Sequence, residues 1–175
     1  MIPKDGGSAV TLVAGRTSSL DPTWGPRGEA IAFTTGSDGP IKIIDLKTRK
    51  IRDLPDSSGF ATPKWSPDGR IVAATRRDSS HSALFDVASR SWRTVVKESG
   101  HYLHWTPDSR RLVYLSAGVE APQLRYLDIG RQAVSSTVEL KGLRRPTFPF
   151  GDWIGLGPGE TPLAVRDLSS QEIQS

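Results

Sequence analysis

The sequence has no cysteine, which excludes disulfide bonds, thiolate metal ligands and cysteine nucleophiles. It also has no apolar run approaching the roughly 20 residues that a helix needs to span a bilayer. Its start, MIPKDGG, lacks the basic and then apolar order of a signal peptide. As written, the sequence therefore predicts a cytoplasmic protein with no membrane contact, and it leaves the compartment of any longer parent protein open.

Charge of one sign is in small excess, with 23 Lys and Arg residues against 19 Asp and Glu residues and a net charge of +4. The excess is spread along the chain instead of forming the dense basic surface that makes many phosphate contacts, so we expect no direct nucleic-acid binding. The 17 glycines and 13 prolines indicate many turns and argue against long helices. The length of 175 residues fits a single domain.

A short sequence with Trp at its start and Pro two positions later recurs at an interval of about 40 residues. The copies are WGPRG at residues 24–28, WSPDG at 65–69 and WTPDS at 105–109, with a weaker copy, LGPGE, at 156–160. An apolar segment follows each copy, and two further apolar segments complete each of the first three periods. Short apolar segments separated by Gly, Pro, Ser and Asp are typical of strands joined by turns.

Four short antiparallel strands per period form the blade of a β-propeller, in which such sheets pack face to face around a central channel. We therefore predict an all-β propeller that occupies residues 1–175 as a single domain. The expected full blades are residues 21–54, 62–96 and 102–140, the expected partial blade is 152–174, and residues 8–13 are expected to form an extra outer strand.

The tryptophans of the repeat, Trp24, Trp65 and Trp105, would lie at the ends of the innermost strands and wedge neighbouring sheets apart. We interpret them as core residues and not as a ligand cage, because large aromatic side chains at a structural period mostly serve packing. Asp45 and Asp86 each end a third strand, where a carboxylate can accept backbone N–H bonds across the next turn. We interpret these aspartates as turn caps.

The pattern of WSPDG followed by an apolar strand resembles the PD40, or TolB-like, β-propeller repeat, and WSPDGRIVA at residues 65–73 is the best copy. The resemblance extends over roughly residues 8–174. It implies a protein of bacterial type whose repeats form six or seven blades, either as an interaction module or attached to a catalytic or DNA-binding domain. The C-terminal residues 162–173 look like the last blade of sensory propellers that follow a winged-helix domain in bacterial regulators. The first copy departs from the pattern at Arg27, the third at Ser109, and the fourth lacks both Trp and Asp.

Three full blades and a partial one leave open how the propeller ends. Closure as four blades is possible in principle, but wedge residues as large as those of bigger rings favour an open arc, such as the C-terminal part of a larger propeller. An open arc exposes apolar blade faces and unpaired strand edges. We therefore expect self-association through the open blade faces.

The sequence offers few groups for catalysis. It has no Gly-x-Ser-x-Gly nucleophile elbow, and its Gly-rich stretch at residues 155–159 lacks the helix that would hold a phosphate. His101 and His104 are three apart on a predicted strand, which would point them to opposite faces and prevent them from sharing a metal ion. We therefore predict no cofactor and no metal site.

Loops on one face of the predicted propeller differ in length and charge while the strands stay regular, and binding residues tend to lie on such loops. The candidate residues for binding a ligand or partner are Arg76, Arg77, His81, Asp38 and Glu120. Among them, Arg76, Arg77 and His81 are the best candidates for recognising an acidic group.

Three hypotheses about function follow. The first, which we favour, is a non-enzymatic propeller module that binds a protein, a peptide or a small ligand, either as a TolB-like protein or as the sensor end of a regulator. The second is a propeller enzyme of lyase or hydrolase type, which requires side chains converging near the channel from inner-strand positions such as Thr23, Lys64, His101 and His104. The third is a truncated remnant without a function of its own.

Overall fold

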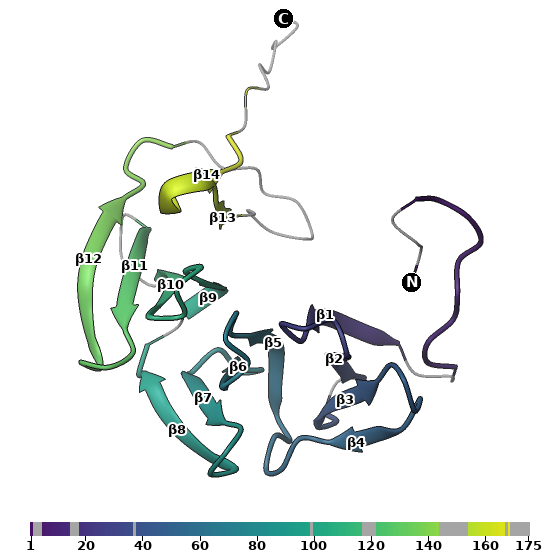
Figure 1. Cartoon of the computed structure of the whole chain (residues 1–175). Coiled ribbons are helices and arrows are strands. Elements are labelled where there is room, and N and C mark those ends of the chain that lie inside the picture. The colour runs from purple at the N-terminus through teal and green to yellow at the C-terminus, as the bar shows by residue number, and fades with distance from the viewer. Residues whose placement is uncertain are drawn as a thin grey trace, which may run out of the picture.

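The sheets of this protein succeed one another around an open arc (Figure 1). The structure is a computed structural model that describes residues 1, 5–14, 18–36, 38–98, 100–116, 122–143, 154–166 and 168. Within these residues, three four-stranded antiparallel sheets and one two-stranded sheet account for all the strands, and the short 3₁₀-helix η1 (Pro158–Glu160) is the sole helical element. The predicted all-β, open propeller is confirmed. No helix in the described part has the length and apolarity needed to cross a membrane.

Strands within each blade are hydrogen-bonded in chain order, and the first strand of each blade is the innermost. Blade 1 comprises β1 (Ser19–Trp24), β2 (Ala30–Thr35), β3 (Ile41–Asp45) and β4 (Ile51–Asp53). Blade 2 comprises β5 (Phe60–Trp65), β6 (Ile71–Arg76), β7 (Ser82–Asp86) and β8 (Ser91–Val96). Blade 3 comprises β9 (Gly100–Trp105), β10 (Arg111–Ser116), β11 (Gln123–Asp128) and β12 (Ala133–Glu139). The partial blade 4 comprises β13 (Ile154–Leu156) and β14 (Pro162–Ala164).

The WSPDG sequence forms the tight turn between the first two strands of blade 2. The amide of Ser66 donates to the carbonyl of Ile71 at 2.8 Å, and the amide of Gly69 donates to the carbonyl of Ser66 at 2.9 Å. Gly69 has a φ of +78°, which glycine adopts without a Cβ clash. The Oδ1 atom of Asp68 accepts hydrogen bonds from the Ser66 hydroxyl at 2.6 Å and from the backbone amide of Arg70 at 3.0 Å.

The departure from this pattern at Ser109 has a structural role. Ser109 occupies the position of Gly69 in the turn of blade 3 and also has a positive φ, of +61°. Its hydroxyl oxygen accepts a hydrogen bond from the amide of Asp68 at 3.0 Å, so it links the turns of blades 2 and 3. A glycine at this position would relieve the backbone but would lose the link between the two blades.

The aspartates that end the third strands cap the following turns, as predicted. Asp45 accepts from the amide of Thr48 at 2.7 Å, and Asp86 accepts from the amide of Ser89 at 2.8 Å. These backbone hydrogen bonds are the main reason that the pKa values of both carboxyl groups lie below their ordinary value.

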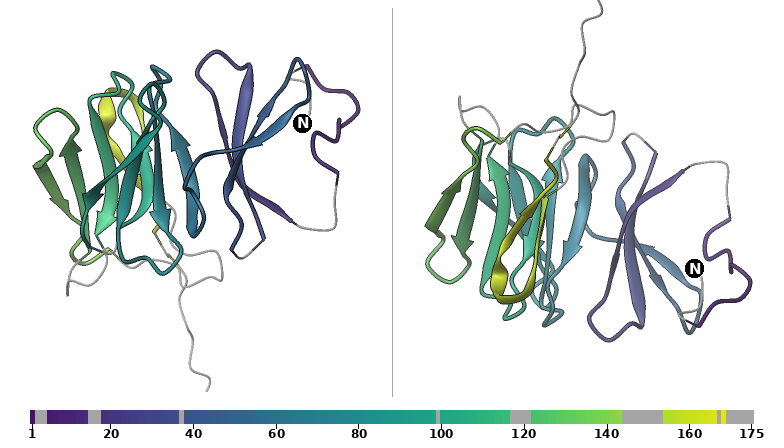
Figure 2. Two further views of the ribbon diagram at one scale, coloured as in Figure 1. Left: turned by 90° about the horizontal axis from the view of Figure 1, so that it is seen from below. Right: turned by 90° about the horizontal axis from the view of Figure 1, so that it is seen from above.

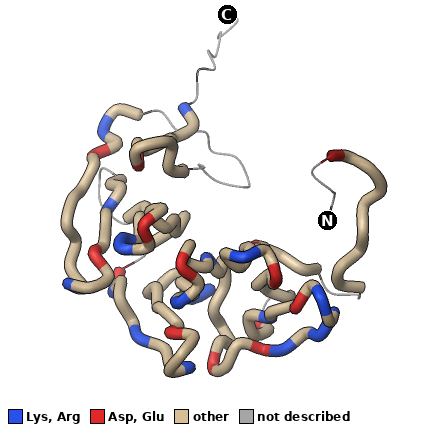
Figure 3. The backbone as a smooth tube through the Cα atoms, viewed as in Figure 1, with Lys and Arg blue, Asp and Glu red and all other residues tan. Residues whose placement is uncertain are grey.

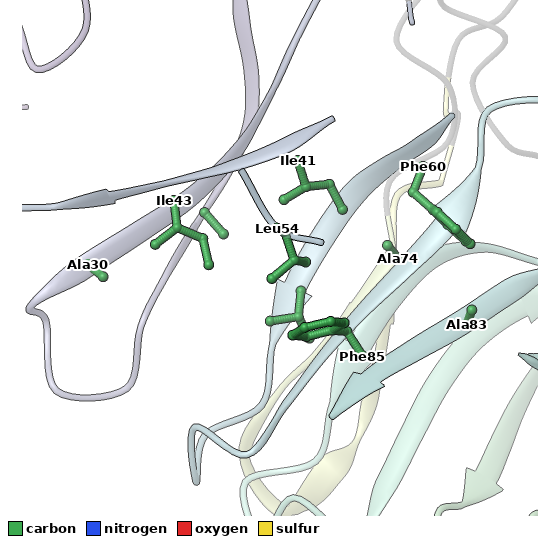
Figure 4. Packing of buried hydrophobic residues seen from close by; sticks show 10 residues of the cluster. Ala30, Ile41, Ile43, Leu54, Phe60, Ala74, Ala83 and Phe85 are labelled. Atoms are coloured by element: carbon green, nitrogen blue, oxygen red, sulfur yellow. The ribbon is translucent and has the colours of Figure 1, made fainter. Parts of the chain in front are cut away.

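The apolar core lies between the blades, where the facing sides of neighbouring sheets meet. Between blades 1 and 2, Ile41, Ile43 and Leu54 pack with Phe60 and Phe85 (Figure 4). The alternation of side chains along each strand places one set of residues on each side of a sheet, so every blade contributes to two such layers. Views along the plane of the arc show the sheets standing side by side with a twist (Figure 2).

Two of the three repeat tryptophans serve as wedges. Trp65 packs against the cluster between blades 1 and 2, and Trp105 packs against the cluster between blades 2 and 3. The indole N–H of Trp105 also donates to the carbonyl of Lys64 at 2.9 Å, which ties blade 3 to blade 2. For Trp24 the predicted core position is wrong. This residue belongs to the blade at the open N-terminal end of the arc, and it is 51% exposed.

The N-terminal residues differ from the prediction. No part of residues 8–13 forms a strand; instead, residues 5–14, which we call the N-terminal strap, lie beside blade 1 (Figure 1). Leu12 and Val13 of the strap pack against Ile31, Phe33 and Ile44 on the open side of blade 1. The physical reason is the apolar face of β2 and β3: packing on it removes Leu12, Val13 and the side chains that they cover from water.

Candidate functional site

The innermost strands of blades 1, 2 and 3 each contain a β-bulge at the same place in the repeat. The pairing register shifts between Leu20 and Thr23, between Ala61 and Lys64, and opposite Val113 and Leu115. The bulged residues have positive φ angles: Asp21 (52°), Thr62 (50°) and Tyr102 (55°). This conformation is rare for a β-branched or bulky residue, and both bulges and such backbone strain are frequent next to functional sites.

The bulges line a cavity of about 380 Å³ on the inner side of the arc. Its walls come from the bulge of β1, from the inner strands β5 and β9, and from the end of β6 with the following loop. The lining residues are Asp21, Ala61, Thr62, Lys64, Thr75, Arg76, Arg77, Ser79, His101, Tyr102, Leu103 and His104. Blades 1, 2 and 3 thus all contribute to one site.

The charged residues that line the cavity are mostly cationic. Lys64, Arg76 and Arg77 contribute three positive charges, and Asp21 is the sole carboxylate among the described lining residues. Elsewhere along the arc, basic and acidic residues are interspersed (Figure 3). A site with this balance of charge attracts an anionic group.

The two arginines of the cavity differ in how they are engaged. Arg76 donates through Nη1 to the carbonyl of Ser58 at 3.0 Å, and its guanidinium carbon lies 5.1 Å from the centre of the Phe60 ring. The amide of Arg77 donates to the carbonyl of Gly59 at 2.9 Å. The Nε and Nη2 atoms of Arg77 are buried and have no hydrogen-bond partner among the described residues. Nε and Nη2 form one edge of the guanidinium group, so Arg77 carries a buried donor edge that no acceptor of the described residues satisfies.

His101 and His104 both line the cavity, so the prediction that they point to opposite faces is wrong. The bulge at Tyr102 is the cause, because an extra residue in the strand changes the alternation of the side chains that follow it. Burial lowers the pKa of His104, and the nearby Lys64 charge lowers it further, while a hydrogen bond with the backbone of Ile154 opposes the shift. No group of three or more His, Asp or Glu among the described residues is arranged to hold a metal ion.

We expect stability to depend on pH through His104. Its folded pKa lies below its ordinary value of 6.5, so the unfolded chain binds a proton first as the pH falls. The free energy of unfolding should therefore decrease as the pH falls from above 6.5 toward the folded pKa. An NMR titration of the imidazole gives the folded pKa directly. The His104→Gln variant should show a smaller loss of stability over the same pH window, and an equal loss would contradict the expectation.

The structure brings together two of the five residues predicted to bind a partner. Arg76 and Arg77 line the cavity, whereas His81 packs edge-on against Phe60, with ring centres 5.9 Å apart, and does not line it. Asp38 is exposed on the loop between β2 and β3 of blade 1 and is not one of the cavity-lining residues. Glu120 and the Arg144–Arg145 pair lie outside the described residues. Binding by any of these residues stays a prediction.

The bulged residues Asp21, Thr62 and Tyr102 are not among the candidates predicted from the sequence. A signal for them exists, because each lies three positions before a repeat tryptophan. Lys64 and His104 share the position just before the tryptophan with Thr23. Thr23 has a structural role, since its hydroxyl oxygen accepts from the amide of Trp65 at 3.2 Å.

No family model and no curated protein matches the chain. Solved structures do match it. TolB from Acinetobacter baumannii superposes with a TM-score of 0.69 at 22% identity, over 93% of this chain and 44% of that chain. Putative TolB from Agrobacterium tumefaciens gives a TM-score of 0.65 at 19% identity, over 79% and 55% of the two chains.

A third match is the β-propeller domain of the Trilobed protease from Pyrococcus furiosus, which has an open velcro topology. Its TM-score is 0.58 at 22% identity, over 75% of this chain and 44% of that chain. The chain spans about half the length of these solved structures. At such identities the matches carry the fold and not a function, and the chain has the TolB-like β-propeller fold.

Proposed function

We propose that the chain is a non-catalytic β-propeller interaction module that binds an acidic group of a protein or peptide partner in the inner cavity. The observation that carries the proposal is the buried, unpaired donor edge of Arg77. Leaving a charged donor buried and unpaired costs more than leaving a neutral one, so the site favours a group that accepts from both nitrogens.

A carboxylate matches this edge better than other common groups. Its two oxygens accept side by side from the planar guanidinium group, and hydrogen bonds between two charged groups are stronger than neutral ones. Lys64 adds a further positive charge to the lining of the same cavity. The cavity volume of about 380 Å³ suits one or two side chains of a partner more than a whole folded surface. The TolB-like fold supports a macromolecular partner, as the repeat resemblance implies.

A capped tetrapeptide of glutamates is a direct probe, with the matching glutamine tetrapeptide as its neutral control. We expect the glutamate peptide to shift the NMR signals of Arg77 and Lys64 and the glutamine peptide to leave them in place. Arg77→Gln should weaken binding of the glutamate peptide at least tenfold, which corresponds to about 1.4 kcal/mol.

Arg70→Gln is the matched control for this change, because Arg70 is an exposed arginine on the Pro-Asp-Gly turn and not in the cavity. It should alter binding by less than about twofold, as expected for a screened surface charge. Equal binding of the two peptides, or equal loss in the two variants, would rule out recognition of a carboxylate by Arg77.

An enzyme is the second candidate, because His101, His104 and Tyr102 converge on the same cavity. The solved structures with a similar fold include an acylaminoacyl peptidase from Pyrococcus horikoshii and an oligogalacturonate lyase in complex with manganese. We rank the interaction module first because general acid–base chemistry needs groups in matched pairs, and the described lining offers a single carboxylate among the cations. Turnover of an acidic oligosaccharide or an acylated peptide that is lost in His104→Gln would reverse this ranking.

A further inference from the structure

The C-terminal end of the arc exposes apolar residues whose counterparts in the preceding blade are buried. In blade 3, Val113 and Leu115 of β10 are 1% and 3% exposed, because Ile154 and Leu156 of blade 4 pack on them. In blade 4 the corresponding residues are Leu163 and Val165, since Leu156 pairs with Pro162 as Trp105 pairs with Leu112. Leu163 and Val165 are 44% and 43% exposed. This end of the arc, which we call the tail, therefore presents the face on which another blade would pack.

The N-terminal end of the arc has the complementary deficit. Trp65 packs on the turn of the preceding blade, where a Cβ on Gly25 would lie 3.5 Å from its ring, and Trp105 bonds to the preceding blade through Lys64. Trp24 has the same position in blade 1, but no preceding blade is present among the described residues and it is half exposed. This end of the arc, which we call the head, lacks a neighbouring blade for Trp24 to pack on, and the tail could provide one.

We propose that a second copy of this chain docks head to tail on the first, so that the tail of each copy packs against the head of the other. The interface would repeat the blade-to-blade packing that the chain already makes three times, between blades 1 and 2, 2 and 3, and 3 and 4. Two arcs of three full blades and one partial blade add up to a ring in the size range of propellers, about four to eight blades. A two-fold axis closes such a ring, because each head meets a tail and no end is left over.

The N-terminal strap competes with this docking. Leu12 and Val13 cover Ile31, Phe33 and Ile44, which form the rest of the head face. The strap forms no strand. Its Val10 amide donates to the carbonyl of Met1, and the N-terminal ammonium group of Met1 donates to the carbonyl of Val10. Docking of a tail therefore requires the strap to leave blade 1, and the strap sets the balance between single and paired copies.

Sedimentation of the full chain between about 1 and 200 µM tests the proposal. The mass should rise with concentration from 19.0 kDa to twice that value and no further. Val165→Asp at the tail and Trp24→Ser at the head should each abolish the rise. Val134→Asp is the matched control: Val134 is 45% exposed, but it lies on β12 at the outer side of blade 3. It should leave the concentration dependence unchanged.

Two further measurements separate this arrangement from other forms of association. An equimolar mixture of the Val165→Asp and Trp24→Ser variants keeps one intact tail and one intact head, so it should recover part of the doubled mass. Replacing both Leu12 and Val13 by alanine should free the head and lower the dissociation constant of the pair about tenfold.

A single mass of 19.0 kDa at all concentrations, for the wild type and for the variant with the weakened strap, would overturn the proposal. Growth beyond two copies would indicate an open chain of arcs and would overturn the closed ring. Pairing that persists in only one of the two end variants would indicate contact between like ends, with the same consequence. Circular dichroism melting curves confirm that each variant is folded before its mass is interpreted.

Discussion

Replacing Trp105 by alanine is expected to lower the free energy of unfolding by about 3 kcal/mol, the lower end of the range for tryptophan truncation in a core. Trp105 is partly buried against the cluster between blades 2 and 3, and its indole N–H bonds to Lys64 of the neighbouring blade. The substitution removes the wedge between two sheets and leaves that carbonyl without its donor. The same substitution at Trp24 should cost about 1 kcal/mol or less, because that side chain is half exposed.

Denaturant unfolding of the two alanine variants measures the difference. The pair is well matched, since both residues are tryptophans at the same position of the repeat and differ in whether a blade precedes them. Trp105→Phe keeps an aromatic ring in the wedge but loses the hydrogen bond, which should account for about 1 kcal/mol, together with part of the packing volume. Equal destabilisation by Trp24→Ala and Trp105→Ala would contradict the assignment of Trp24 to an open end. The measurement is made at low protein concentration, where copies do not pair.

Gly69→Ala is expected to destabilise the fold by about 2–3 kcal/mol through two effects that add. The φ of +78° at Gly69 is costly for any residue with a Cβ, by about 1–2 kcal/mol. The new Cβ would also lie 2.8 Å from Cγ of Pro26, a ring atom in the turn of blade 1 that cannot rotate away. Separating the turns of blades 1 and 2 to relieve this contact would disturb the packing beneath them.

Gly28→Ala provides the control for the backbone effect. Gly28 has the same place in the turn of blade 1 and a similar φ of +70°, and no atom lies within 4 Å of the position that a Cβ would take. Its destabilisation should be about 1 kcal/mol, so the difference between the two variants reports the contact between blades. Thermal or urea unfolding provides both values. A Gly69→Ala variant that is no less stable than Gly28→Ala would show that the turns of blades 1 and 2 are not in close contact.

The fold could be predicted because its determinants are local and repeated. Trp65 with its Ser-Pro-Asp-Gly turn fixes a hairpin through hydrogen bonds within six residues, and the same frame recurs at Trp105. Asp45 and Asp86 cap their turns through residues three positions away. Such contacts follow from residue type and spacing, so one period of sequence is enough to predict one blade.

The cavity could be predicted only in part, because it depends on geometry that breaks the rule of alternation. Arg76 and Arg77 were found from their loop, but the convergence of His101 with His104 follows from the bulge at Tyr102. Nothing in strand periodicity predicts an inserted residue, and the alternation rule alone gave the opposite answer. The strap was mispredicted for a related reason: SAVTLV at residues 8–13 suits a strand, but the uncovered face of blade 1 binds its side chains without pairing its backbone.

Because every strand pairs with its neighbour in the chain, each sheet can assemble from contacts made over a short stretch of polypeptide. Closing short loops costs little entropy, which favours rapid formation of single blades. Each blade then gains further stability by packing against the neighbouring sheets, as in other linear repeat proteins. Blade 2 lies between two complete blades, whereas blade 1 and the two-stranded blade 4 each lie at an end. Protection of backbone amides from hydrogen exchange should therefore be strongest at β6 and β7 and should decrease toward both ends of the arc. Thermal unfolding should begin at the two ends and proceed toward blade 2.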